Sequence, residues 1–248
     1  MGHYTVSVPG RQLSAPGEIA GLPRARQIPP PLMPSRYFPP ANRAGPDGLV
    51  LIGGRLSTPR LLDAYRHGIF PWPAQSFDLI PWCSPDPRAI LPLDGMHISR
   101  RLERTRRSGK FAITYDTAFA EVIEGCASGD DRRGGTWLTV EMIAAYTELH
   151  RLGHAHSVET WHDGALAGGV YGVAIGGLFA AESMFYRVRD ASKVALAGLV
   201  ERLQDRGFQL LDVQQPTPHS RSMGAIEIPR QDYLRQLRDI VDLAVTFG

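Results

Sequence analysis

The sequence has few cysteines and almost no net charge. Its two cysteines, Cys83 and Cys126, form neither a disulfide framework nor a paired metal motif, which is the pattern of a protein kept in a reducing cytosol. The formal net charge is only +2 for 248 residues, so the chain as a whole does not attract nucleic acid. Any contact with an acidic partner must therefore come from a local basic patch, and we expect a cytoplasmic protein.

Long apolar runs and phosphate-binding loops are also absent. No run approaches the ~20 apolar residues that a membrane-spanning helix needs. No Walker loop occurs, and no G-x-G-x-x-G motif follows a predicted strand, so the common nucleotide-binding loops are excluded. The composition is 43% hydrophobic and 21% charged, which is typical of a globular protein with a sizeable core.

Proline is unevenly distributed and suggests how the chain is organised. Ten of the 20 prolines lie in the first 48 residues, and proline neither continues a helix nor donates a ladder hydrogen bond. We therefore predict a flexible Pro-rich arm over residues 1–30. A small N-terminal domain over 31–87 and a larger domain over 88–248 follow, with the boundary in the Pro-rich segment near Arg88.

Helix and strand signals alternate through the rest of the chain. Before the boundary, "GLVLIGG" predicts a short buried strand, "LSTPRLLDAYRHG" a helix, and residues 70–88 a loop. After it, we expect strands over 88–93, 111–115, 155–161, 165–175, 177–185 and 208–214, and helices over 99–109, 117–126, 139–153, 191–207 and 229–245. His162-Asp163-Gly164 is typical of a hairpin turn. The pattern predicts an α+β fold, a mixed sheet with helices on its faces.

One acidic residue stands in an otherwise small and apolar strand. Glu182 lies within "GGLFAAESMFYR", and a carboxylate among such residues is costly to bury unless it is paired or hydrogen-bonded. The strand could present a polar face to water, or Glu182 could line a substrate pocket. Both interpretations stay open on this stretch alone.

A pair of polar residues occurs in "LLDVQQ". Asp212 and Gln214 are two residues apart on a predicted strand, so they share a face. The Asp212 carboxylate could accept a hydrogen bond from the Gln214 side-chain amide and leave the Gln214 carbonyl free for a substrate. The alternative is a strand end that reaches solvent.

Five arginines occur in the eight residues 100–107. On a helix, Arg100, Arg104 and Arg107 form one stripe, offset in sign only by Glu103. Such a stripe is either a solvated face or a contact with the phosphate backbone of a nucleic acid.

Aromatic and histidine residues suggest further contacts. Tyr65, Trp72 and Tyr146 could stack nucleobases, although each could equally be a core residue. Four histidines and Glu159 occur within residues 150–162, but the predicted elements separate them, so we predict no metal site.

Taken together, these segments resemble the leucyl/phenylalanyl-tRNA–protein transferase family. The resemblance runs from residue 46 to 236 and includes "GLVLIGGRLSTPRLLDAYRHGIFPW", "WCSPDPRAIL", "HISRRL", "GTWLTVEMIAAYTELHRLGHAHSVE", "GGVYGVAIGGLFAAESMFYRVRDASKVAL", "LLDVQ" and "MGAIEIPRQDYL". It implies a GNAT-like (acetyltransferase-type) catalytic domain after the small N-terminal domain. The implied reaction moves Leu or Phe from aminoacyl-tRNA to the N-terminal amine of proteins that begin with Arg or Lys, which marks them for degradation by the N-end rule.

The resemblance also implies roles for individual residues. The catalytic groups would be Asp212, Gln214 and Glu182, and the tRNA 3′ end would contact Tyr65, Trp72 and Tyr146. The aminoacyl pocket would be formed by Val170, Phe179, Met184 and Leu211. The tRNA backbone would contact Arg100, Arg104 and Arg107. Some members carry Met where this chain has Val170, which leaves the preference among Leu, Phe and Met open. Because the aminoacyl ester is already activated, no metal, cofactor or covalent nucleophile is expected, and we expect a monomer.

The acceptor must be a neutral amine, and the ordinary pKa of an α-amine is ~7.7–8.0. Gln214 would position that amine, since a glutamine is a poor base, and Glu182 would attract a cationic acceptor. Two alternatives remain. A GNAT-type acyl-CoA N-acyltransferase lacks support because the pyrophosphate-binding loop is missing, and a non-catalytic RNA-binding module leaves Glu182, Asp212 and Gln214 unexplained.

Overall fold

The computed structural model describes residues 32–72, 79–128 and 138–248 of the chain. Contacts divide the chain into a unit Met1–Pro30 and a unit Pro31–Gly248, and all the described residues belong to the second unit. The predicted Pro-rich arm over residues 1–30 lies outside the described residues. Within the described ranges, no helix is both long and apolar enough to cross a membrane.

The first part of this unit forms a small antiparallel sheet and one helix. The strands β1 (Leu49–Ile52), β3 (Pro81–Cys83) and β2 (Phe70–Pro71) pair in the order β1-β3-β2. A short 3-10 helix, η1 (Ala41–Arg43), precedes them, and helix α1 (Thr58–Arg66) connects β1 to β2.

The remaining described chain is built around a seven-stranded mixed sheet. Its order is β10-β4-β9-β8-β7-β6-β5, and every neighbouring pair is antiparallel except β8 and β9, which are parallel. Its strands are β4 (Arg88–Leu91), β5 (Ala112–Tyr115), β6 (Ala155–His162), β7 (Ala165–Ile175), β8 (Leu178–Tyr186), β9 (Leu210–Gln214) and β10 (Ile226–Ile228). The helices among them are α2 (Arg100–Arg107), α3 (Phe119–Ala127), α4 (Val140–Arg151), α5 (Ala191–Arg206), α6 (Pro218–Ser222) and α7 (Arg230–Ile240).

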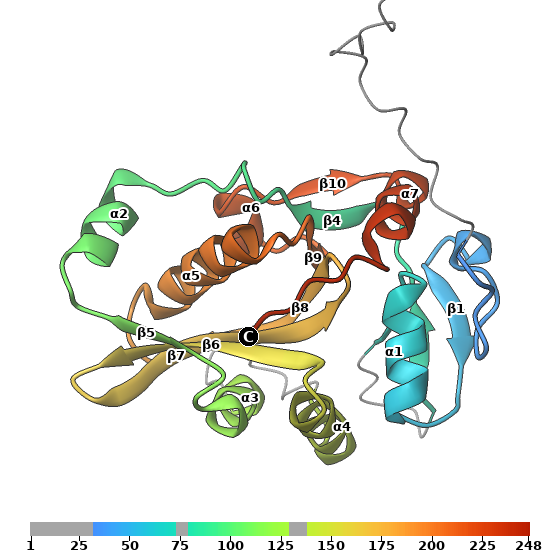
Figure 1. The fold of residues 1–248 in the computed structure, drawn as a ribbon, viewed down its shortest axis with the longest axis horizontal. Coiled ribbons are helices and arrows are strands. Elements are labelled where there is room, and N and C mark those ends of the chain that lie inside the picture. The colour runs from blue at the N-terminus through green and yellow to red at the C-terminus, as the bar shows by residue number, and fades with distance from the viewer. Residues whose placement is uncertain (1–31, 73–78, 129–137) are drawn as a thin grey trace, which may run out of the picture. The chain divides into compact units, whose positions relative to one another are not determined.

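Helices cover both faces of the large sheet, as Figure 1 shows. α5 packs on one face, where Leu196, Leu199 and Leu203 are buried in one hydrophobic cluster. α3 and α4 pack on the opposite face and share a second cluster with α1. The predicted mixed sheet with helices on its faces, preceded by a small N-terminal segment, is therefore confirmed.

Several local signals in the sequence produce the expected structure. The Ser99 hydroxyl caps α2 by accepting the Leu102 N–H at 3.2 Å. Asp163 and Gly164 both have positive φ, 50° and 77°, which is the geometry of a tight turn between β6 and β7.

The N-terminal segment differs from its prediction in two respects. β1 is an edge strand rather than a buried one, and Ile52 is 52% exposed. The stretch predicted as a loop over residues 70–88 contains β2 and β3. β3 tolerates Pro81 because a proline can occupy the first position of a strand, and Trp82 anchors the strand by donating its indole N–H to the Gly53 carbonyl at 2.9 Å.

The C-terminal elements also differ from their prediction. The last helix ends at Ile240 instead of continuing to residue 245, because the chain turns there and buries Phe247 beside Phe179. α6 and β10 were not predicted. The boundary at residues 87/88 falls at the start of β4 and stays a prediction; one hydrophobic cluster contains Tyr65 from before it and Tyr146 from after it.

Candidate functional site

The two parallel strands of the large sheet, β8 and β9, separate part of the way along their length. Their pairing ends at Ala180 and Asp212, although both strands continue. Each has a β-bulge just beyond this point. Tyr171 and Gly172 of β7 pair with Ser183 and Ala181, which leaves Glu182 without a partner in the strand ladder. A bulge re-aims side chains, and bulges are frequent beside active sites.

The corresponding bulge in β9 leaves Val213 unpaired in the ladder, because Ala89 and Ile90 of β4 pair with Gln214 and Asp212. The gap between β8 and β9 holds a cavity of about 360 Å³. Its lining consists of Ala181, Glu182, Ser183, Met184, Tyr186, Ser192, Leu196, Val213, Gln215, Thr217, His219 and Ser220. This volume lies within the range of ligand-binding pockets, and the lining mixes apolar walls with a few polar groups.

Glu182 is the carboxylate of this cavity. Its Oε1 accepts a hydrogen bond from Gln214 Nε2 at 2.6 Å, and its Oε2 accepts one from the Tyr146 hydroxyl at 2.9 Å. The Tyr146 and Tyr65 hydroxyls are 2.7 Å apart. Since Tyr146 uses its single proton on Glu182, Tyr65 is the donor to Tyr146. A continuous hydrogen-bonded chain thus runs from α1 through α4 to β8 and β9.

The pKa of Glu182 is raised to about 7, mainly by burial and in smaller part by the nearby Asp212, whereas the hydroxyls of Tyr65 and Tyr146 and the Gln214 amide oppose this shift. Glu182 therefore changes its charge close to neutral pH. Burial and the Glu182 charge raise the pKa values of Tyr65 and Tyr146 well above their ordinary values, so both hydroxyls stay protonated donors.

Asp212 is completely buried and is fully engaged with protein groups. Arg88 donates to both of its oxygens, from Nε to Oδ1 at 2.9 Å and from Nη2 to Oδ2 at 2.6 Å. The Tyr233 hydroxyl donates to Oδ2 at 2.8 Å, and the backbone N–H of Gln214 donates to Oδ1 at 2.8 Å. The predicted bond from the Gln214 side-chain amide to Asp212 is therefore wrong, because Asp212 binds the Gln214 backbone.

Gln214 adopts the left-handed backbone conformation, with φ of 62°, at the end of β9. This turns its side-chain amide to Glu182, which takes the orienting role that we expected of Asp212. The side-chain carbonyl oxygen of Gln214 (Oε1) accepts no hydrogen bond from the residues that the structure describes, so it is available to a hydrogen-bond donor of the substrate.

The four residues predicted for the aminoacyl pocket occupy different positions. Met184 lines the cavity. Val170, Phe179 and Leu211 do not; they are at most 1% exposed and belong to the hydrophobic cluster on the α5 side of the sheet. Val170 lies directly opposite Met184 in the β7–β8 pair, so these residues support the cavity from behind.

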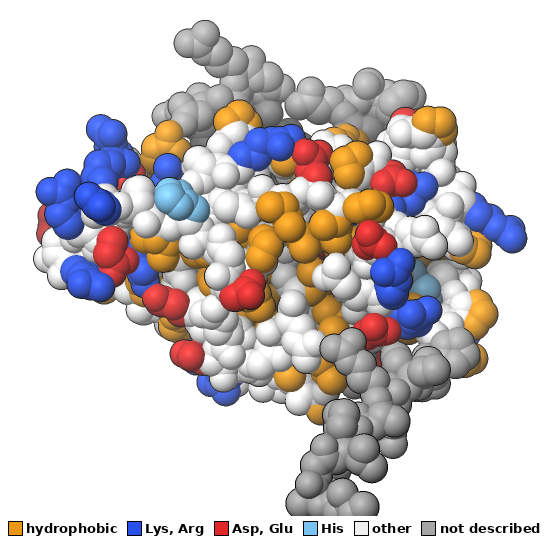
Figure 2. Space-filling view, turned by 90° about the horizontal axis from the view of Figure 1, so that it is seen from above, with side chains coloured by type: hydrophobic (Ala, Val, Ile, Leu, Met, Phe, Trp, Pro, Cys, Tyr) orange, Lys and Arg blue, Asp and Glu red, His pale blue; other side chains and the backbone are white. Residues whose placement is uncertain are grey.

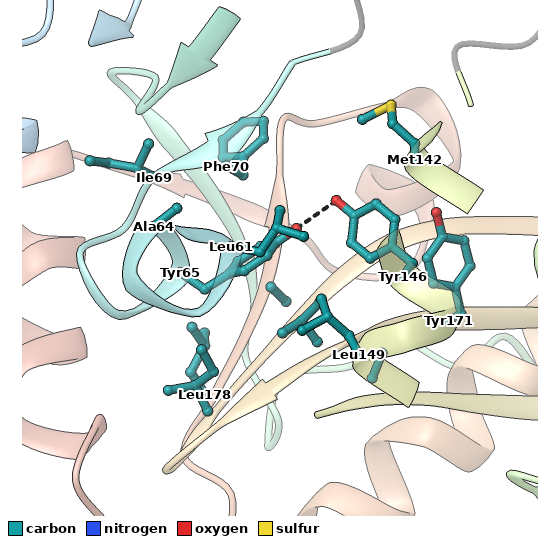
Figure 3. Close-up of a cluster of buried hydrophobic side chains, with 14 of the residues drawn as sticks. Leu61, Ala64, Tyr65, Ile69, Phe70, Met142, Tyr146, Leu149, Tyr171 and Leu178 are labelled. Atoms are coloured by element: carbon teal, nitrogen blue, oxygen red, sulfur yellow. Dashed lines mark hydrogen bonds between the residues drawn. The ribbon is translucent and has the colours of Figure 1, made fainter. Parts of the chain in front are cut away.

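The aromatic residues predicted to contact the tRNA end are mostly core residues in this structure. Figure 3 shows Tyr65 and Tyr146 within a cluster of buried side chains, with their hydroxyls directed at each other. They are 1% and 0% exposed, so neither ring face is open for stacking. Trp72 is half-buried and packs beside Phe70.

The arginines of α2 divide into two groups. Arg101 pairs with Asp190, and Arg106 pairs with Glu103 and Glu201. Arg100, Arg104 and Arg107 are exposed, as the helical stripe predicts, and Arg107 also contacts Glu103. Figure 2 shows Lys and Arg side chains gathered at the end of the molecule where α2 lies.

Sequence reasoning missed three residues of this site. Arg88 and Tyr233 hold Asp212, and the only signals were an arginine at the start of an apolar strand and a tyrosine within a charged helix. His219 lines the cavity, and its buried Nε2 has no hydrogen-bond partner among the described residues. Burial and Lys193 lower the pKa of His219, so the ring is neutral at pH 7.

The histidines near residue 154 have structural partners. His156 Nδ1 lies 2.7 Å from Asp116, and the His150 ring stacks on Phe119 at 4.2 Å. Within the described ranges, no group of three or more His, Cys, Asp or Glu side chains is placed to hold a metal ion.

The family models and the relatives that match this chain agree on one protein family. Residues 90–238 match the model of "Leucyl/phenylalanyl-tRNA protein transferase", and residues 54–86 match the model of its N-terminal domain. The chain is 55% identical over 203 residues to a leucyl/phenylalanyl-tRNA–protein transferase of Nitratidesulfovibrio vulgaris, covering 82% of this chain and 86% of that protein. It is 50% identical to one of Thiobacillus denitrificans, covering 86% and 94%. Among solved structures, a GCN5-related N-acetyltransferase from Kribbella flavida has 10% identity and a TM-score of 0.37, covering 68% and 59%.

Proposed function

Since the chain belongs to the leucyl/phenylalanyl-tRNA protein transferase family, whose members are aminoacyltransferases, we propose the specific reaction that it catalyses. It transfers Leu or Phe from aminoacyl-tRNA to the N-terminal α-amine of proteins that begin with Arg or Lys. It acts as a cytoplasmic monomer, and its product carries a destabilising N-terminal residue that commits the protein to degradation.

The observation that carries this proposal is the contact between Glu182 and Gln214 across the gap between β8 and β9. In the reaction, the acceptor nitrogen forms a bond to the ester carbonyl carbon, and the bond from that carbon to the tRNA ribose oxygen breaks. The nitrogen gives up a proton, and the ribose oxygen gains one. The ester is already activated, so the main task of the protein is to hold the two substrates in line.

Gln214 positions the acceptor amine. Glu182 accepts from the amide nitrogen of Gln214 and so leaves the Gln214 carbonyl oxygen free to accept a hydrogen bond from the amine. The Glu182 carboxylate lines the cavity and, when ionised, attracts the cationic N-terminal residue of the acceptor. Asp212 supports this arrangement through the Gln214 backbone rather than through the side chain.

The apolar side of the cavity receives the transferred amino acid. Met184, Leu196 and Val213 supply that side, with Val170, Phe179 and Leu211 packed behind them. The site that binds the tRNA 3′ end includes Tyr65, Tyr146 and Trp72. Tyr65 and Tyr146 act there through the chain of hydroxyl hydrogen bonds that ends on Glu182. The exposed Arg100, Arg104 and Arg107 bind the tRNA backbone by neutralising phosphates.

A filter assay tests the reaction. Labelled Phe-tRNA is incubated with the full chain and a peptide that begins with Arg, and label in the peptide is counted. The same peptide with an acetylated N-terminus is the control, because its nitrogen cannot attack. We expect label only in the free-amine peptide, and peptides beginning with Lys should behave likewise.

The same assay separates the alternatives. Transfer from acetyl-CoA but not from Phe-tRNA would identify an acyl-CoA N-acyltransferase. Binding of Phe-tRNA without any transfer would identify an RNA-binding module. Competition among Leu-, Phe- and Met-tRNA then ranks the donors.

A further inference from the structure

Arg88 is a buried cation that stands outside the lining of the cavity. Its side chain is 1% exposed. Nε and Nη2 donate to the two oxygens of Asp212, and Nη1 donates to the Gly68 carbonyl at 3.0 Å. The guanidinium also lies over the rings of Phe70 and Tyr233, 4.6 and 4.4 Å from their centres.

Stability alone is a weak reason to keep such a group. Removing two charges from water costs energy that their attraction often fails to recover, and apolar residues of similar size frequently serve as well. Each of the three nitrogens of Arg88 nevertheless donates to an acceptor that is itself buried or part of the backbone. This arrangement restrains the position of the Asp212 carboxylate closely.

The restrained carboxylate holds Gln214 in an unfavourable conformation. The left-handed region is disfavoured for a residue other than glycine, so a specific contact must maintain it. That contact is the Gln214 N–H, which donates to Asp212 Oδ1 at 2.8 Å, the same oxygen that Arg88 Nε holds. The conformation in turn directs the Gln214 amide to Glu182.

We propose that Arg88 is a positioning residue for aminoacyl transfer, which acts by fixing Asp212 and, through it, the backbone of Gln214. The inference rests on the proposed function, in which Gln214 holds the acceptor amine. Lysine cannot replace Arg88, because a single nitrogen cannot reach both oxygens of Asp212 and the Gly68 carbonyl together.

A double-mutant cycle tests this role in the full chain. Arg88→Lys, Gln214→Ala and the double variant are assayed for Phe transfer from Phe-tRNA to a peptide that begins with Arg, well below each melting midpoint. We expect Arg88→Lys to lower kcat about 100-fold, the size of a misplaced reacting group, and to change KM for Phe-tRNA by less than about threefold. The double variant should be no slower than Gln214→Ala, because Arg88 acts only through Gln214.

Arg230→Lys is the matched control. Arg230 is also largely buried and donates to the carbonyls of Ser84 and Ala44, but it does not contact Asp212. We expect it to lower the melting temperature at most and to leave kcat unchanged.

Other outcomes overturn the proposal. If the losses of Arg88→Lys and Gln214→Ala multiply in the double variant, or if Arg88→Lys loses activity only in proportion to its folded fraction, Arg88 is a structural ion-pair partner. If Gln214→Ala transfers at the wild-type rate, the proposal fails while the family reaction stands. If the wild-type protein transfers nothing, the proposed function itself fails.

A second variant keeps the test decisive if Arg88→Lys does not fold. Arg88→Met combined with Asp212→Leu removes both charges together and so avoids the unpaired buried charge that either single change would leave. We expect it to lose kcat about as strongly as Arg88→Lys, because nothing then holds Gln214. A wild-type rate in this variant would overturn the positioning role.

Discussion

The Gln214 side-chain nitrogen donates to Glu182 Oε1 at 2.6 Å across the gap where the parallel strands β8 and β9 separate. A bulge in each strand sets this position: Glu182 is the bulged residue of β8, and Val213, which precedes Gln214, is the bulged residue of β9. The bond links β9 to Glu182, which lines the cavity, and it leaves the side-chain carbonyl oxygen of Gln214 free. In our account, the acceptor amine binds there.

Glu182 should control the pH dependence of transfer. Its pKa is about 7, so the carboxylate becomes anionic as the pH rises through 7, while the acceptor amine becomes neutral near ~7.7–8.0. Both changes favour transfer, and the slope of log(kcat/KM) for the acceptor peptide against pH should approach about 2 below pH 7. In Glu182→Gln only the amine titrates, and the slope should fall to about 1. An unchanged slope would mean that Glu182 does not titrate in the reaction.

Glu182 should also make stability depend on pH. Its folded pKa of about 7 is raised above the ordinary 4.5, so between these values the folded state keeps a proton that the unfolded chain releases. The free energy of unfolding therefore falls as pH rises from 4.5 to 7 and levels off above 7. Relative to the wild type, Glu182→Gln should gain at most ~3 kcal/mol across this window and little below pH 4.5. Urea unfolding at several pH values measures the difference; a constant difference contradicts the raised pKa.

The exposed arginines of α2 should bind phosphates without reading bases. Replacing Arg100, Arg104 and Arg107 with Ala should weaken binding of several aminoacyl-tRNAs equally and reduce the slope of log K against log salt by about two to three. Arg151, Arg235 and Arg238, also exposed, provide a control triple with the same charge change on α4 and α7. If both triple variants lose the same affinity, the effect is one of net charge and the α2 stripe is not a binding site.

Met184 should shape the aminoacyl pocket. Met184→Ala enlarges the cavity and should reduce transfer of Leu and Phe about tenfold or more, with Phe-tRNA affinity within about twofold. Met223→Ala is the control, because Met223 is buried in the hydrophobic cluster against which Met184 packs but does not line the cavity. Equal effects of the two variants on transfer and on circular dichroism would indicate that Met184 is only a core residue.

His219 should show opposite effects on stability and on activity. Its buried Nε2 has no partner among the described residues, so His219→Leu removes an unsatisfied polar atom and should raise the free energy of unfolding by roughly 1 kcal/mol. The ring lines the cavity, so transfer should fall while Phe-tRNA binding stays close to the wild type. A variant that is less stable and fully active would assign His219 a purely structural role.

The sequence indicated which residues belong together but not how they make contact. Glu182, Asp212 and Gln214 stood out because polar side chains on otherwise apolar strands need partners. Strand alternation could not reveal the two bulges or the left-handed Gln214, so it assigned the Gln214 side chain to Asp212 instead of Glu182. The cavity depends on where β8 and β9 separate, which is a matter of register that the sequence does not reveal. Val170 and Phe179 were expected at its wall because of the family resemblance.

Arg88 escaped sequence analysis for a related reason. An arginine before "AILPL" has the pattern of a solvent-facing strand start, whereas β4 lies between β9 and β10 and is buried along its whole length. Only the tertiary arrangement brings its guanidinium to Asp212. The Ser99 and Thr139 caps and the β6–β7 turn were predictable, because their signals are local.

Single-turnover transfer of Phe from Phe-tRNA to a peptide that begins with Arg decides whether the reaction centre lies between β8 and β9, with Phe-tRNA affinity measured on the same preparations. Gln209→Ala, on the exposed approach to β9, serves as the control and should behave like the wild type. We predict that Gln214→Ala and Glu182→Gln each slow transfer about 100-fold or more, with affinity within about twofold. Wild-type transfer by both variants, or losses that only follow affinity, would contradict a reaction centre between β8 and β9.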